Sequence, residues 1–118
     1  LNLTFFHSNW YECLPRNKWD LLVSNPPYVS ESDPHLDALE KEPLEALVSG
    51  TDGLKAIRQI VRGSSCFLNP QGHLLIEHGF NQSEAVSRIF AASGFENILS
   101  AKDYSGIERV KLGKFNGR

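Results

Sequence analysis

The sequence has little of what marks a membrane protein or a nucleic-acid binder. No apolar run reaches the length needed to span a bilayer, and no signal-peptide pattern opens the chain. The 12 Lys and Arg residues are outnumbered by 14 Asp and Glu residues, so the basic excess of a typical nucleic-acid-binding surface is missing. We therefore expect no membrane partner and no direct binding to nucleic acid.

Cysteine is scarce and methionine is absent. Cys13 and Cys66 are far apart and lack the spacing of a CxxC motif or a Cys/His metal site. This favours reduced, non-catalytic thiols in a cytoplasmic protein, and no metal site is predicted. The chain opens at Leu1 rather than at an initiator methionine, so we expect a fragment or a processed form. Its 118 residues suffice for one small domain.

The order of the apolar runs predicts an α/β sheet. The run within residues 19–24 is continuous, which is typical of a strand buried on both faces in a parallel sheet. The last two strands have no helix between them, so they should pair antiparallel. Residues 30–50 predict a long loop, and residues 69–72 predict a turn. The strands are expected at residues 3–6, 19–24, 73–77, 95–101 and 108–112.

Two amphipathic helices are predicted between these strands. Asp52 can cap a helix that follows Gly53. Asn81 and Glu84 resemble a capping box for a second helix, which ends before Gly94. The expected apolar faces are Leu54, Ile57, Ile60 and Val61 in the first helix and Val86, Ile89 and Phe90 in the second.

Asn25, Pro26, Pro27 and Tyr28 directly follow the strand predicted at 19–24. In doubly wound sheets, ligands bind at the carboxyl ends of strands. An amide or exocyclic amino nitrogen is a poor nucleophile, so acceptors must draw on its N–H groups while it attacks a methyl sulfonium. The Asn25 side-chain oxygen and the Pro26 carbonyl can accept these groups, and Tyr28 offers a flat wall. The prolines keep the acceptors rigid as charge develops. We interpret Asn25, Pro26 and Tyr28 as catalytic and all four residues as substrate-binding.

A purely structural interpretation of this tetrapeptide is also open. Asparagine and proline form turns, and a tyrosine after a strand can simply pack against the sheet. The position directly after a buried apolar strand favours the interpretation as a methyltransferase.

Five further blocks extend the pattern. With them the sequence resembles class I methyltransferases that modify planar nitrogens, in particular the HemK/PrmC-type N5-glutamine methyltransferases of peptide chain release factors. The resemblance covers essentially the whole chain. The blocks, in order, are residues 19–28 (WDLLVSNPPY), 31–36 (ESDPHL), 42–47 (EPLEAL), 50–54 (GTDGL), 74–79 (LLIEHG) and 103–109 (DYSGIER).

The resemblance implies a Rossmann-like class I methyltransferase fold with S-adenosyl-L-methionine as the methyl donor. The implied substrate is a glutamine in the Gly-Gly-Gln loop of a release factor, which links the activity to translation termination. Asn25 would touch both the donor and the substrate amide, while Pro26, Pro27 and Tyr28 would form the substrate slot. Trp10 matches an aromatic position near the donor's adenine, although a tryptophan at the rim of the core is the alternative.

Part of the family pattern has no counterpart here. The glycine-rich donor-binding turn, the ribose-binding acidic residue and the N-terminal helical domain do not occur in these 118 residues. Residues 1–118 therefore match the C-terminal part of the catalytic domain, and we expect the isolated chain to be inactive. The resemblance further implies structural roles for Glu77, His78 and Arg109. The absent strands would lie beside residues 19–24, so we expect either poor order in residues 1–18 or a covered sheet edge, for example through self-association.

Two other functions stay open. N6-adenine DNA or RNA methyltransferases share the Asn-Pro-Pro-Tyr chemistry, but they flip the base out and need a basic recognition surface. A truncated, non-catalytic module that acts as an interaction surface is the second alternative.

Overall fold

The computed structural model describes residues 3–15, 17–30, 50 and 52–117. The long loop predicted at 30–50 lies outside the described residues except for its two ends, as do the family blocks at 31–36 and 42–47. The described elements are β1 (Trp19–Ser24), α2 (Lys55–Gly63), the 3₁₀ turn η2 (Ser64–Cys66), β2 (Leu68–Glu77), α3 (Ser83–Ala92), β3 (Phe95–Lys102) and β4 (Glu108–Phe115).

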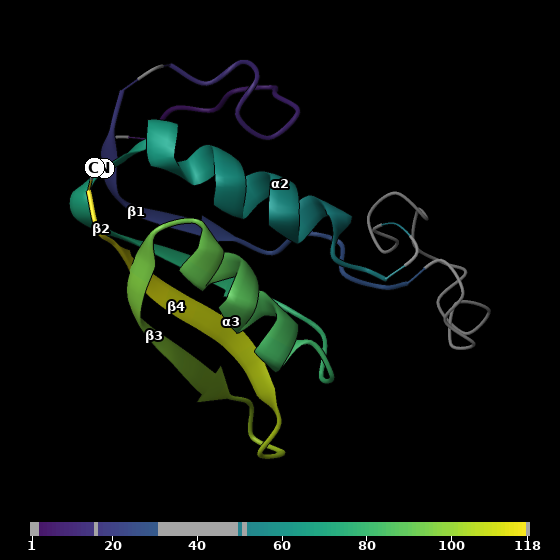
Figure 1. The fold of residues 1–118 in the computed structure, drawn as a ribbon. Helices are drawn as coiled ribbons and strands as arrows, with labels where there is room; N and C mark the ends of the chain where they lie inside the picture. Colours follow the sequence, from purple (N-terminus) through teal and green to yellow (C-terminus); the bar gives the residue numbers. More distant parts are fainter. Residues whose placement is uncertain (1–2, 16, 31–49, 51, 118) are drawn as a thin grey trace.

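The described strands form one mixed sheet with the order β1-β2-β4-β3 (Figure 1). β1 and β2 run parallel, and β4 pairs antiparallel with both β2 and β3. The α/β class, the parallel start and the antiparallel last pair are therefore confirmed. The chain reaches β3 before β4, but β4 lies between β2 and β3, so the hairpin folds back onto the middle of the sheet.

Three strand boundaries differ from those predicted: β2 begins earlier, at Leu68, and β3 and β4 end later, at Lys102 and Phe115. Residues 69–72 form no turn between elements but belong to β2, where they bulge out of the ladder. Trp19 pairs with Leu68 and Leu21 with His73, so two steps along β1 match five steps along β2. Gln71 takes a positive φ of 71° within this bulge, which absorbs the proline and glycine that suggested a turn.

The strand predicted at residues 3–6 is wrong for this structure. These residues adopt no regular secondary structure, and Leu3, Phe5 and Phe6 are 66%, 85% and 48% exposed. A strand needs a neighbour for its N–H and C=O groups, and none of the described strands pairs with this segment. The β-prone composition alone therefore does not produce a strand here.

Both helices pack on one face of the sheet, as Figure 1 shows. The predicted apolar faces of the helices are buried there; Ile89 is only partly buried. Gly94 follows α3 with a φ of +89°, as expected for a residue that ends a helix. The core comprises Leu54, Ile57, Ile60, Val61, Leu68, Leu74, Ile76, Val86, Phe90, Phe95 and Phe115.

The starts of the two helices only partly follow the predictions. Asp52 accepts the backbone N–H of Leu54 at 3.0 Å and pairs with Arg58, so it orders the turn before α2. Arg58 and the Leu54 N–H both hold the pKa of Asp52 below its usual value. The capping box at α3 is wrong: Gln82 is the N-cap residue, and its side chain makes no capping bond to the helix.

The opposite face of the sheet carries an apolar row. Val23, Leu75, Leu112 and Leu99 are paired across all four described strands. Val23 is 65% exposed and Leu99 is 61% exposed, and Leu21 at the edge of the sheet is 55% exposed. The prediction that β1 is buried on both faces is therefore wrong for this chain, because no described element covers this side of β1.

Among the described residues, no helix is long and apolar enough to cross a membrane.

Candidate active site

The Asn25–Tyr28 segment leaves the sheet at the carboxyl end of β1, beside the end of β2. Because these strands are parallel and Ser24 pairs with Ile76, residues 25–28 meet residues 77–79 at the same edge. The Pro26 side chain is fully buried, whereas Asn25 is exposed. Pro26 thus anchors the segment in the protein, and Asn25, the residue before it, presents a polar amide at the surface.

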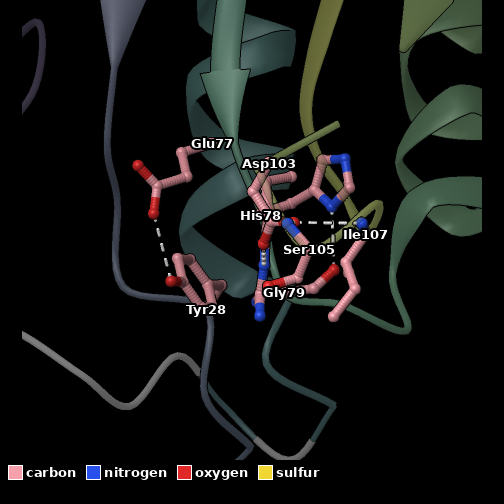
Figure 2. A network of polar contacts seen from close by, with 8 residues as sticks. Tyr28, Glu77, His78, Gly79, Asp103, Ser105 and Ile107 are labelled. Carbon is pink, nitrogen blue, oxygen red and sulfur yellow. Dashed lines mark hydrogen bonds and ion pairs between the residues drawn. The ribbon is translucent and has the colours of Figure 1, made fainter. Parts of the chain in front are cut away.

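Tyr28 is held at both its side chain and its backbone. Its hydroxyl donates a hydrogen bond to Glu77 Oε1 at 3.2 Å, as Figure 2 shows. Its carbonyl oxygen accepts a hydrogen bond from Gln82 Nε2 at 2.8 Å. The position of the Tyr28 ring, which was predicted to be a wall of the substrate slot, therefore depends on β2 and on the start of α3.

The turn after β2 is held in the same network. The N–H of Gly79 donates to Gln82 Oε1 at 2.7 Å, and the His78 Nδ1–H donates to the Gly79 carbonyl at 2.8 Å. His78 is fully buried, and burial is the main cause that lowers its pKa, so the ring is neutral at pH 7. A buried, neutral ring that orders a turn is compatible with the structural role that the resemblance implied for His78.

A glycine allows the network to close around Tyr28. Gly53 has a φ of +76°, and a Cβ at this position would lie 2.4 Å from the Tyr28 carbonyl oxygen and 2.8 Å from Gln82 Nε2. Neither distance is possible for a real side chain. The turn before α2 therefore touches the Tyr28–Gln82 hydrogen bond directly, and only glycine fits there.

Trp10 lies in a turn that precedes β1, in the left-handed region with a φ of 55°. The Ser8 hydroxyl accepts the Cys13 N–H and donates to the Trp10 carbonyl, both at 2.8 Å, which stabilises this turn. The neighbouring Tyr11 ring stacks on Phe67, the residue directly before β2, with 4.6 Å between the ring centroids, and this contact holds the turn against the start of β2. Trp10 packs on the core and lines a cavity of about 160 Å³ that also contacts Ser24, the residue before Asn25.

Arg109, which the resemblance marked as structural, pairs with Asp103 in the turn of the β3–β4 hairpin. Asp103 accepts the N–H groups of Ser105 and Ile107 at 2.8 and 3.0 Å and pairs with Arg109 at 3.2 Å. The Ile107 N–H is the main cause that lowers the pKa of Asp103. The carbonyl of Arg109 accepts the His78 N–H at 2.8 Å, so the hairpin is joined to the turn after β2.

Sequence reasoning missed two residues of this site, Gln82 and Gly53. Asn81 and Glu84 have the spacing of a capping box, which predicted Asn81 rather than Gln82 as the capping residue at the start of this helix. The available signal for Gln82 was a polar residue three positions after Gly79, at the end of the turn that follows the Glu77-His78-Gly79 block. The signal for Gly53 was a glycine directly before a helix, which is compatible with many ordinary turns.

Comparisons with known proteins give the context for this geometry. No family model matches the chain. It is 47% identical over 116 residues to the release factor glutamine methyltransferase of Pasteurella multocida, covering 96% of this chain and 39% of that protein. The same enzyme of Haemophilus influenzae is 43% identical over 115 residues, with 96% and 39% covered. That of Coxiella burnetii is 38% identical over 113 residues, with 96% and 41% covered.

Solved structures show the same similarity. The release-factor-specific protein-(glutamine-N5) methyltransferase of Alicyclobacillus acidocaldarius matches with a TM-score of 0.54 and 27% identity, covering 83% of this chain and 49% of that one. A Pyrococcus furiosus methyltransferase matches with a TM-score of 0.58 and 16% identity, covering 86% and 43%. The predicted fold, part of a Rossmann-like class I methyltransferase, is confirmed, and so is the resemblance to release factor glutamine methyltransferases. The chain spans about two fifths of the length of these curated relatives.

Proposed function

We propose that this chain forms the substrate half of a site that methylates a glutamine side-chain amide in a peptide chain release factor. The observation that carries the proposal is the Asn25–Tyr28 segment. It leaves a parallel strand at its carboxyl end, is anchored at Pro26 and Tyr28, and leaves Asn25 exposed. The names of the similar proteins support glutamine as the methylated residue.

Three residues of the segment, Asn25, Pro26 and Tyr28, each have a task that their position supports. The Asn25 side-chain oxygen and the Pro26 carbonyl accept the two N–H groups of the substrate amide, and these bonds strengthen as the nitrogen becomes cationic. The Tyr28 ring forms the wall against which the planar amide lies. No strong base is needed, because the alkylated nitrogen loses its proton readily.

The residues present fit S-adenosyl-L-methionine as the methyl donor. The cavity beside Ser24 is lined mainly by apolar and aromatic side chains, including Trp10 and Tyr11, which suits a flat adenine ring. Trp10 would lie against that ring, and Asn25 would contact the donor next to the reacting methyl group. When bound, the donor supplies an electrophilic methyl group on a sulfonium.

A chimera provides the test of this function. In it, the present chain replaces the matching segment of the Pasteurella multocida enzyme, whose remaining residues supply the rest of that protein. We expect the chimera to methylate a release factor on the glutamine of its Gly-Gly-Gln loop, as detected by mass spectrometry of that peptide. A folded chimera that binds the donor but leaves this glutamine unmodified would refute the proposal.

The adenine alternative can be tested with the same chimera. Asn25 and Tyr28 would serve an exocyclic amino group by the same chemistry, so the residues alone do not separate the two substrates. The surplus of acidic over basic residues favours the protein substrate. Filter binding with duplex DNA at moderate salt, together with a methylation assay on that DNA, separates the two substrates.

We also propose that the 118-residue chain by itself is inactive, resides in the cytoplasm and self-associates. The apolar row and β1, which is an edge strand of the described sheet, offer a surface that a second copy would cover. Sedimentation velocity should therefore show dimers or larger species. Replacing Leu21 and Val23 together by lysine should restore the monomer, whereas replacing the exposed Phe80 by lysine should not. A monomeric wild-type chain would contradict this prediction.

Tyr28 is expected to act mainly through its ring. In the chimera, Tyr28→Phe should retain most of the activity, because the ring and the Gln82 bond to the backbone both remain. Tyr28→Ala should raise KM and lower kcat, because the amide loses its wall. Steady-state kinetics with the release factor provide the measurement, with Tyr104→Ala, on an exposed hairpin residue, as the control. Equal damage by Phe and Ala would assign the main role to the hydroxyl and its bond to Glu77.

A further inference from the structure

We propose that Gln82 is a positioning residue for methyl transfer, because its side chain fixes the backbone of Tyr28 and thereby the geometry of the Asn25–Tyr28 segment. The inference rests on the proposed function and extends it to a residue outside the Asn-Pro-Pro-Tyr motif. It starts from the hydrogen bonds that a buried amide makes to two separate parts of the chain.

Both ends of the Gln82 amide are engaged. Its oxygen accepts the Gly79 N–H at 2.7 Å, and its nitrogen donates to the Tyr28 carbonyl at 2.8 Å. Only one orientation of the amide satisfies a donor on one side and an acceptor on the other, so the assignment of oxygen and nitrogen is determined by the contacts. The residue is only 7% exposed, so these bonds form where water competes little.

The side chain of Gln82 does not serve its own helix. Gln82 is the N-cap residue of α3, yet it makes no side-chain bond to the first turn of that helix. It reaches instead across to Tyr28, 54 positions earlier in the sequence. A residue that served only as the N-cap of α3 would not need a hydrogen bond to Tyr28. This bond therefore indicates that Gln82 acts on the segment at the end of β1.

The contacts around Tyr28 form a closed circuit. Tyr28 bonds through its hydroxyl to Glu77 and through its carbonyl to Gln82, and Gln82 in turn bonds to Gly79, two residues beyond Glu77. Gly53 packs directly against the Tyr28–Gln82 bond. Loss of the Gln82 donor would remove this bond to the Tyr28 carbonyl but keep the bond from the Tyr28 hydroxyl to Glu77. The Tyr28 backbone could then shift while the end of the side chain stays in place.

This circuit bears on catalysis because the acceptors of the slot lie in the same short segment. Pro26 anchors one end of the segment and Tyr28 the other, so Asn25 and the Pro26 carbonyl keep their orientation only while both anchors hold. A displacement of about 1 Å at a reacting group can cost about 10²-fold in rate, even when no contact with the substrate is lost.

The test uses Gln82→Glu and Gln82→Met in the chimera. Glutamate keeps the size of the side chain and the acceptor for Gly79 but cannot donate to the Tyr28 carbonyl when ionised. Methionine keeps the approximate length without either bond. Gln59→Glu is the matched control, because Gln59 is exposed on α2. Kinetics are measured well below the melting temperature, and donor affinity is measured by calorimetry.

We expect both Gln82 variants to lower kcat about 10- to 100-fold while the affinity for the donor stays unchanged. Gln59→Glu should match the wild type. If Gln82 were merely structural, the variants would lose melting temperature but keep the kcat of the folded enzyme, and the inference would be overturned.

Failure of the proposed function gives a different result. The wild-type chimera would then leave the release factor unmodified, and Gln82 would be judged by hydrogen exchange. Faster exchange of the Gly79 and Tyr28 amides in Gln82→Met than in wild type would support the positioning role at a site for another substrate. Unchanged exchange would overturn it.

Discussion

Replacing Asn25 by alanine in the chimera should lower kcat about 10²-fold or more, which is the typical cost of removing one preorganised group that stabilises developing charge. The Asn25 side chain is exposed at the end of β1, so its removal leaves no cavity in the core. Its oxygen would accept an N–H group of the substrate amide, and this bond gains strength only as the nitrogen acquires positive charge. The loss should therefore appear in kcat more than in KM.

Single-turnover kinetics on a release factor, with melting curves for each variant, measure this effect. Asn17→Ala is a suitable control, because Asn17 is an exposed asparagine before β1 and lies outside the slot. Wild-type turnover in Asn25→Ala would remove Asn25 from the mechanism. If the melting temperature of Asn25→Ala fell so far that the variant was unfolded at the assay temperature, the lost activity would be explained by a structural role instead.

The largest effect on stability is expected for Phe90→Ala. Phe90 is fully buried in α3, and its ring lies 5.1 Å from that of Phe95, centroid to centroid. A Cβ on Gly113 would lie 2.5 Å from the Phe90 ring, so the β4 backbone packs directly on this ring. Truncation would leave a cavity between helix and sheet, and such changes typically cost about 3–5 kcal/mol.

Urea denaturation of the chimera measures this cost through the midpoint of unfolding at an unchanged m-value. Phe80→Ala offers a matched control, because Phe80 is 61% exposed and its removal should change the free energy of unfolding little. A loss below about 1 kcal/mol in Phe90→Ala would show that α3 collapses onto the sheet without a cavity.

Local patterns predicted the elements that pack on the core. Leu54, Ile57, Ile60 and Val61 recur at helical spacing, and this period alone predicts one buried face made of the N-cap residue Leu54 and three residues of α2. The continuous apolar run before Asn25 predicted the bounds of β1, although not the exposure of one of its faces, and Gly94 marked the end of α3. These predictions succeeded because burial of an apolar face depends on the spacing of residues along the chain.

Three predictions failed because the contact that each required is not made by the described residues. Residues 3–6 have the composition of a strand, but no described strand pairs with them. Val23 is an apolar residue of the type usually buried, but no described helix or strand covers its face of the sheet. Asn81 and Glu84 have the spacing of a capping box, yet Glu84 pairs with Arg88 instead. In each case the local signal was present and the contact that would use it was not.

For the candidate site, the sequence by itself determined the candidate segment: a strand, two prolines, and an asparagine and a tyrosine in fixed order. Backbone stiffness and the chemistry of these side chains are local properties, so they can be predicted without a fold. Only the tertiary structure decided what holds this segment, namely Gln82, Gly53 and the end of β2. The physical reason is that a hydrogen bond between residues 54 positions apart depends on how two strands and a helix pack, and no spacing along the chain encodes it.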